Sequence, residues 1–115
     1  MTHKDIEEFL FSLPKVWLDY PFGEGSAVYK YGDKPDGKIV AIVAENTKPL
    51  RVSLKCDPQL AEVLREKYET VVPGYHLSKK HWNTILLTGQ MPDQEVLDLV
   101  RLSHRLVSGE LTIAD

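Results

Sequence analysis

Cysteine, long apolar runs and low-complexity tracts are what this 115-residue sequence most clearly lacks. Cys56 is the only cysteine, so an internal disulfide is excluded, which fits a reducing compartment. The longest apolar run, Ile39 to Ala44, is far shorter than the roughly 20 residues that a membrane-spanning helix needs. The N-terminus is acidic early and lacks the basic segment followed by an apolar one that is typical of a secretory leader. We therefore expect a cytoplasmic protein that has no contact with a membrane.

Repeats and linkers are also absent, which argues against an array of domains. The length suits one domain, residues 1–115, whose hydrophobic core needs neither disulfide nor metal to fold. Hydrophobic residues make up 43% of the chain and charged residues 27%, as is ordinary for a soluble globular domain. We expect a single domain, and a monomer in preference to an assembly.

Positive charge is in the minority overall but is concentrated in the middle of the chain. The formal net charge is −3, which argues against a strong general affinity for nucleic acid. Residues 48–84 hold seven basic and four acidic residues, so this segment carries +3 and the remainder carries −6. The acidic excess lies mainly near the two ends of the chain. The sequence thus predicts a basic central region in an acidic molecule.

The spacing of apolar residues predicts a helix followed by three strands. Thr2 with Asp5 resembles a helix capping box, and apolar residues at helical spacing follow until Pro14 limits the helix. Strands are expected over residues 27–31, 38–44 and 50–56, with a glycine- and proline-containing turn between the first two.

The last of these strands alternates, so its two faces differ in character. Arg51, Ser53 and Lys55 point to one side, whereas the apolar residues and Cys56 point to the other. A cysteine on an apolar face behaves as a small hydrophobe, because a reactive thiol needs an electropositive and partly exposed setting. We therefore expect Cys56 to be structural.

Helix and strand signals alternate in the second half of the chain. Asp57-Pro58 predicts the start of a second helix, and residues 83–88 predict another strand. Pro92-Asp93 predicts the start of a last helix, with a natural stop at Gly109. Because short turns join consecutive strands, we expect an α+β fold in which N-terminal, middle and C-terminal helices pack on an antiparallel sheet.

Recognisable motifs of catalysis, cofactor binding and metal binding are missing. His76 and His81 have no cysteine pair or carboxylate at ligand spacing, and His3 and His104 are isolated from the other histidines. Residues 22–26, "FGEGS", lack the third glycine of a dinucleotide fingerprint and the lysine of a phosphate-binding loop. We expect a non-enzymatic protein with no catalytic residue, no cofactor and no dedicated metal ligand. One alternative is a weak cation site formed by Asp5, Glu8 and Asp19.

The densest chemistry lies in "YHLSKKHWN", residues 75–83, which follows a turn signal at Pro73-Gly74. Lysines neutralise phosphates, aromatic and imidazole rings stack on bases, and an asparagine side chain bonds a base edge or a phosphate. The candidate nucleic-acid-binding residues are Lys79, Lys80, His81, Trp82 and Asn83, extended by Lys55 and Arg51. Two alternatives stay open: the same surface docks an acidic protein partner, or Trp82 simply anchors the sheet while the lysines are solvated.

Residues 52–87 resemble the signature of the MmcQ/YjbR family, a group of small bacterial proteins. The matching features are "KCDP", "VPGYH" and "KKHW", while Ser78 stands where asparagine is more usual. The resemblance implies a CyaY-like α+β fold, similar in architecture to frataxin. It also implies a DNA-binding function through a "double wing" of two hairpin-like projections. Its frataxin likeness keeps the weak cation binder as an alternative to DNA or other nucleic acid.

Overall fold

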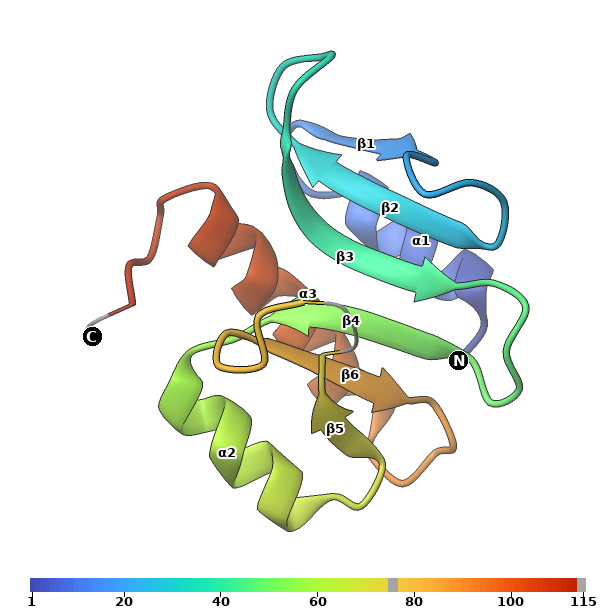
Figure 1. The fold of residues 1–115 in the computed structure, drawn as a ribbon, viewed down its shortest axis with the longest axis vertical. Helices are drawn as coiled ribbons and strands as arrows, with labels where there is room; N and C mark the ends of the chain where they lie inside the picture. The colour runs from blue at the N-terminus through green and yellow to red at the C-terminus, as the bar shows by residue number, and fades with distance from the viewer. Residues whose placement is uncertain (75–76, 114–115) are drawn as a thin grey trace.

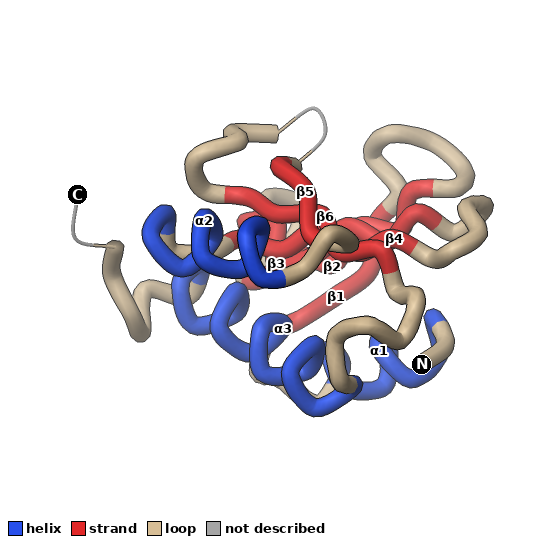
Figure 2. The backbone as a smooth tube through the Cα atoms, turned by 90° about the horizontal axis from the view of Figure 1, so that it is seen from below, coloured by secondary structure: helices blue, strands red, loops and turns tan. Residues whose placement is uncertain are grey.

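The computed structural model describes residues 1–74 and 77–113, which form a six-stranded antiparallel sheet with three helices on one face (Figures 1 and 2). In chain order the elements are α1 (His3–Phe11), β1 (Val16–Asp19), β2 (Ser26–Tyr31), β3 (Lys38–Ala44), β4 (Arg51–Lys55), α2 (Pro58–Lys67), β5 (Val71–Pro73), β6 (Trp82–Leu86) and α3 (Asp93–Val107). The strand order in the sheet is β1-β2-β3-β4-β6-β5. The predicted α+β class with an antiparallel sheet is confirmed.

Helices α1 and α2 begin where the sequence predicts, because local side chains satisfy their first N–H groups. At α1 the Thr2 hydroxyl accepts from the Asp5 N–H at 3.2 Å, and the Asp5 carboxylate accepts from the Thr2 N–H at 2.9 Å. At α2 the Asp57 carboxylate accepts from two N–H groups of the first turn at 3.0 and 3.2 Å. In the described part of the chain, no helix has the length and apolarity to cross a membrane.

Two short edge strands, β1 and β5, were not predicted. They have four and three residues, which is too short for the alternation of apolar residues to be distinctive. Pro73 was expected in a turn, but it ends β5 and pairs with Asn83 of β6. The strand expected over residues 83–88 instead spans Trp82–Leu86. Both edge strands owe their conformation to the neighbouring strands with which they pair.

The hydrophobic core lies between the sheet and the helices. Ile6 and Leu10 of α1, and Val96 and Val100 of α3, are buried against the sheet. Cys56 is buried in the same core, as predicted, with 3% of its surface exposed.

A buried serine joins α3 to the sheet. The Ser103 hydroxyl donates to the Val40 carbonyl at 2.6 Å and accepts from the Lys55 N–H at 3.0 Å. The ladder between β3 and β4 is registered from Ala44 opposite Arg51 to Ala41 opposite Leu54. Ser103 therefore bridges the two strands at the next position, where Val40 and Lys55 would otherwise pair directly.

The other face of the sheet, here called the open face, carries no helix (Figure 2). Residues opposite one another in antiparallel strands point to the same side. The register therefore places Val28, Ile42, Ser53 and Thr84 in one row across the open face. Figure 2 shows loops rising on this side, so the open face is framed by connections rather than covered by secondary structure.

Candidate nucleic-acid interface

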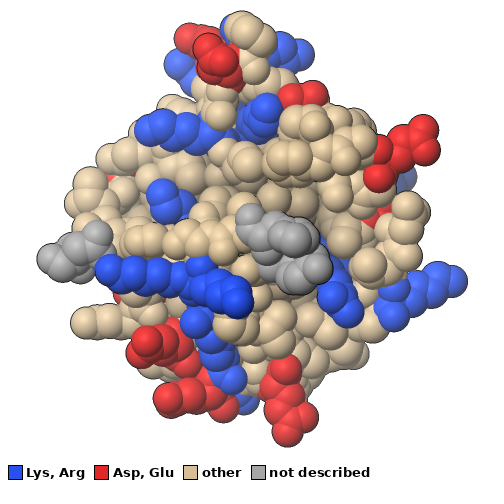
Figure 3. All heavy atoms as spheres, viewed as in Figure 1, with Lys and Arg blue, Asp and Glu red and all other residues tan. Residues whose placement is uncertain are grey.

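Strands β4 and β6 position several of the predicted contact residues on the open face. Lys55 stands opposite Trp82, and Arg51 stands opposite Leu86. The central strands β3, β4 and β6 contain no aspartate or glutamate. In Figure 3, which looks onto the open face, lysine and arginine side chains occur near its middle and acidic side chains gather toward its edges. Part of the basic character predicted for the middle of the chain thus lies on this face.

Lys79 and Lys80 lie on a tight turn beside β6, residues 78–81, which we call the lysine turn. The His81 N–H donates to the Ser78 carbonyl at 3.2 Å and closes the turn. Both lysines are exposed on it. The Cys56 N–H donates to the His81 carbonyl at 2.7 Å, and this bond ties the turn to the end of β4. Backbone bonds therefore hold the turn on the sheet.

Arg65 of α2 supports the same turn from the helix side. Its Nε donates to the Asn83 carboxamide oxygen at 2.6 Å. Its Nη2 donates to the carbonyls of Lys79 and Trp82, the latter at 3.2 Å. The guanidinium thus joins the start of β6 to the turn that carries the two lysines. We refer to this arrangement, Arg65 with its three acceptors, as the arginine clamp.

Asn83 does not belong to the surface, and its predicted contact with nucleic acid was wrong. Only 3% of its surface is exposed. Its oxygen accepts from Arg65, and its Nδ2 donates to the Ala61 carbonyl at 3.3 Å. The register puts Asn83 opposite Leu54, on the helix side of the sheet. Its carboxamide is committed to the chain itself and is not available to a phosphate or a base.

His81 and Trp82 are both half-buried, so their side chains combine packing with some exposure. Trp82 packs on Gly74, where an added Cβ would lie 2.7 Å from the Trp82 Cβ. The Gly74 N–H also donates to the Trp82 carbonyl at 2.9 Å. Part of Trp82 therefore anchors the sheet, as one of the two alternatives expected. Tyr75 and His76, neighbours of this cluster in the sequence, lie outside the described residues.

The acidic residues proposed for a cation site have structural partners. Asp5 caps α1, and the hydrogen bonds from Thr2 lower the pKa of its carboxyl group. Asp19 pairs with Lys30 at 2.9 Å, and this hydrogen bond lowers the pKa of Asp19. Within residues 1–74 and 77–113, no three His, Cys, Asp or Glu residues are grouped so as to hold a metal ion. Asp5 and Asp19 are thus already engaged within the chain, which argues against the cation site.

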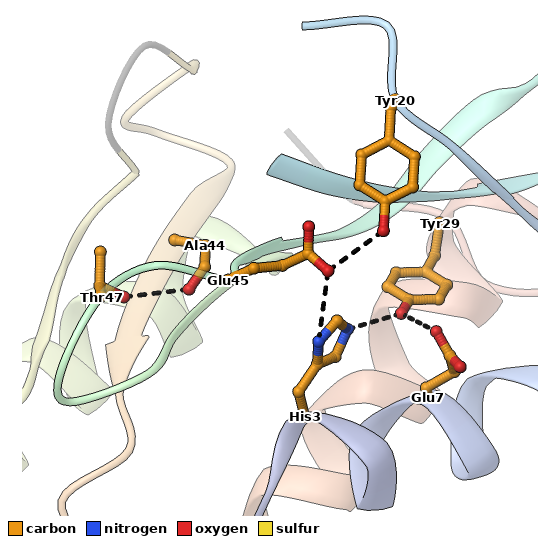
Figure 4. A network of polar contacts seen from close by, with 7 residues as sticks. All are labelled: His3, Glu7, Tyr20, Tyr29, Ala44, Glu45 and Thr47. Atoms are coloured by element: carbon orange, nitrogen blue, oxygen red, sulfur yellow. Dashed lines mark hydrogen bonds and ion pairs between the residues drawn. The ribbon is translucent and has the colours of Figure 1, made fainter. Parts of the chain in front are cut away.

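A polar network connects α1 to the sheet on its helix side (Figure 4). The Tyr29 hydroxyl donates to Glu7 at 2.5 Å and lies 2.7 Å from the His3 Nε2. Glu45 accepts from the Tyr20 hydroxyl at 3.1 Å, and its carboxylate lies 3.7 Å from the His3 Nδ1. Burial, followed by the bond to Glu7, raises the pKa of Tyr29 far above its usual range. The network thus joins α1 to β2 and to the residues that directly follow β1 and β3.

Sequence comparisons relate this chain to several bacterial proteins. The YjbR family model matches residues 11–106. The Uncharacterized protein YjbR of Escherichia coli K12 is 40% identical over 72 residues, which cover 63% of this chain and 61% of that protein. The Uncharacterized protein YbdF of Escherichia coli O157:H7 is 32% identical over 113 residues, which cover 98% of this chain and 89% of that protein. The match therefore spans less than two thirds of YjbR but most of YbdF.

Solved structures support the same relationship. The crystal structure of the Deinococcus radiodurans protein DR2400 superposes with a TM-score of 0.91 at 35% identity, over 96% of this chain and 82% of that one. A Pseudomonas syringae protein superposes with a TM-score of 0.76 at 24% identity, over 93% of this chain and 99% of that one, and it supports the fold alone. Taken with the family model and the near full-length match to YbdF, these findings show that the chain belongs to the YjbR family.

Proposed function

We propose that this protein binds nucleic acid, DNA in the first instance, through the open face and the adjoining lysine turn. The observation that carries the proposal is the position of Lys55 and Trp82, which face one another on a sheet surface whose central strands contain no acidic residue. Lys79 and Lys80 stand beside this pair on a turn held by the arginine clamp. The proposed interface is therefore Lys79, Lys80, His81, Trp82, Lys55 and Arg51, without Asn83.

The chemistry of this surface suits a polyanion. Lysine and arginine side chains neutralise phosphates and release condensed counterions, which favours binding at low salt. The exposed part of Trp82 offers a face on which a base stacks. A turn that is already fixed loses little conformational freedom on binding. Because the whole chain carries a net charge of −3, we expect a modest affinity that falls steeply with salt.

The finer architectural proposal is a CyaY-like, frataxin-like sheet with two projecting wings. The connection between β2 and β3, residues 32–37, projects beyond the sheet in Figure 1 and serves as one candidate wing. The lysine turn between β5 and β6 serves as the other. Lys34 lies 5.3 Å from the centre of the Trp17 ring, so the first wing also presents a cation beside an aromatic ring. A cytoplasmic location is part of the same proposal.

The test is a fluorescence-anisotropy titration of a labelled duplex of about 20 base pairs at several salt concentrations. We expect Lys79→Gln/Lys80→Gln to weaken binding about ten-fold at low salt and to make the salt slope shallower by about one for each lysine. The matched control is Arg101→Gln/Arg105→Gln, which removes two exposed cations from α3 on the opposite side of the sheet. Equal loss in both double variants would contradict the assignment to the open face. If neither the wild type nor either double variant bound the duplex, the surface would instead be assigned to binding an acidic protein partner.

A further inference from the structure

A groove of about 570 Å³ lies on the open face, and of its described lining residues only Arg51 belongs to the interface proposed above. Its floor is made by Ile42, Ser53 and Thr84, which follow one another across β3, β4 and β6. Phe22, from the connection between β1 and β2, and Leu77, from the segment before β6, also line it. The volume falls in the range of roughly 300 to 1,000 Å³ that is usual for small-molecule sites.

The floor carries a hydrogen-bonding group that is only partly satisfied by the chain. The Ser53 Oγ and the Thr84 Oγ1 are 2.8 Å apart, so one hydroxyl donates to the other. The accepting hydroxyl keeps its own hydrogen, and within residues 1–74 and 77–113 the pair makes no second side-chain bond. One O–H donor is therefore available to a ligand on the floor.

The wall of the groove includes an exposed aromatic ring. Phe22 has 64% of its surface in solvent, the largest value among the large hydrophobic residues described. Leaving an aromatic ring in water forfeits the free energy that its burial would provide. Together with Ile42 and Leu77, Phe22 can contact a flat apolar ligand on several sides. These side chains suit a ring or a branched hydrocarbon.

Of the described residues that line the groove, one is charged, and its charge is positive. Arg51 is exposed on β4, and no described residue forms a side-chain hydrogen bond or an ion pair with its guanidinium. None of the described residues that line the groove is acidic. A guanidinium presents two parallel N–H groups that match the two oxygens of a carboxylate. The charge of the groove is thus complementary to a single anionic group.

We infer that this groove binds a small organic anion with an apolar body, such as an aromatic carboxylate. The carboxylate lies on Arg51, the ring lies against Phe22, Ile42 and Leu77, and the Ser53–Thr84 pair donates to a polar substituent. This ligand is not a nucleic acid, so the inference goes beyond the proposed function. The two proposals share only Arg51.

The probes are 2-naphthoate and its neutral counterpart 2-naphthamide, each titrated into the isotope-labelled protein and followed by amide chemical shifts. We expect saturable binding of 2-naphthoate, with shifts in β3, β4 and β6, and binding of 2-naphthamide that is about ten-fold weaker. Arg51→Gln should reduce the affinity for 2-naphthoate to that for 2-naphthamide. Arg105→Gln, which removes an exposed guanidinium from α3, should leave both affinities unchanged.

Phe22→Ala separates recognition of the ring from recognition of the charge. Because Phe22 and Arg51 are both exposed, neither substitution should disturb the fold. Phe22→Ala should weaken both probes by the same factor, whereas Arg51→Gln should weaken only the anion. Equal affinity for the two probes, no effect of Arg51→Gln, shifts confined to the helix side, or no binding at all would each overturn the inference.

Discussion

At the scale of single residues, Arg65 serves three acceptors that belong to one turn and one strand. Removing its guanidinium leaves the buried Asn83 oxygen without its charged donor. A buried polar group without a partner costs about 1 to 3 kcal/mol. We therefore expect Arg65→Met to lower the free energy of unfolding by about that amount, measured by urea denaturation. Arg65→Lys should recover little of the loss, because an ammonium group lacks the planar fork.

The control for this prediction is Arg105→Met on α3. Arg105 is exposed, and its 3.7 Å contact with Glu110 is between two exposed side chains. Exposed ion pairs contribute little to stability. If Arg65→Met and Arg105→Met changed the free energy of unfolding equally, the arginine clamp would not have the structural role given to it here.

The Cys56 thiol gives a pH-dependent prediction. Burial, followed by the charge of Asp57, raises the pKa of Cys56 to about 11. The thiol of an unfolded chain has a pKa near 8.5. Between these values the unfolded chain loses the proton that the folded chain retains, so stability falls as the pH rises. We expect the free energy of unfolding to fall more steeply between about pH 8.5 and about pH 11 in the wild type than in Cys56→Ala. Parallel pH dependences would contradict the burial argument.

Single residues also show where reading the sequence succeeded and where it did not. Alternation in β4 correctly placed Cys56 in the core and Arg51 on the outer face. The same rule puts Asn83 and Ile85 on one side of β6, and Ile85 is buried. A buried asparagine needs partners, and that was the available signal for Arg65. The partner's identity could not be predicted, because α2 meets β6 only through the tertiary fold.

At the scale of secondary-structure elements, the long segments were predictable and the short ones were not. The capping residues predict helices α1 and α2, and the apolar run predicts strand β3. Strands β1 and β5 carry no such signal, because pairing with a neighbour rather than intrinsic propensity decides their conformation. The candidate interface depends on β4 and β6 lying side by side, so its outline could not be predicted from the sequence alone.

The junction of α3 with the sheet gives a prediction at this scale. Ser103 is fully buried and bridges β3 to β4 through one hydroxyl. We expect Ser103→Ala to lower the free energy of unfolding by about 1 to 3 kcal/mol, because the Lys55 N–H loses this acceptor. Thermal and urea denaturation measure the effect. The control is Ser78→Ala at an exposed position of the lysine turn, and an equally small effect of both substitutions would contradict the bridging role.

At the scale of the whole molecule, the middle of the open face carries basic side chains and no acidic ones, whereas both kinds occur toward its edges (Figure 3). The sequence predicted a basic centre, and the sheet gathers part of it on the open face, away from the helices (Figure 3). The family relationship and the α+β class were predictable from the sequence and are confirmed. The proposed binding of nucleic acid follows from this distribution of charge and from the position of Lys55 opposite Trp82.

The measurement that tests the central claim most directly is amide chemical-shift mapping of the isotope-labelled protein during titration with a DNA duplex at low salt. We predict that the largest changes fall in β4, at the start of β6 and in the lysine turn, and that they vanish as salt is raised. Helices α1 and α3 should show little change, because they lie on the other face of the sheet. Changes centred on those helices, or no changes at all, would contradict the account.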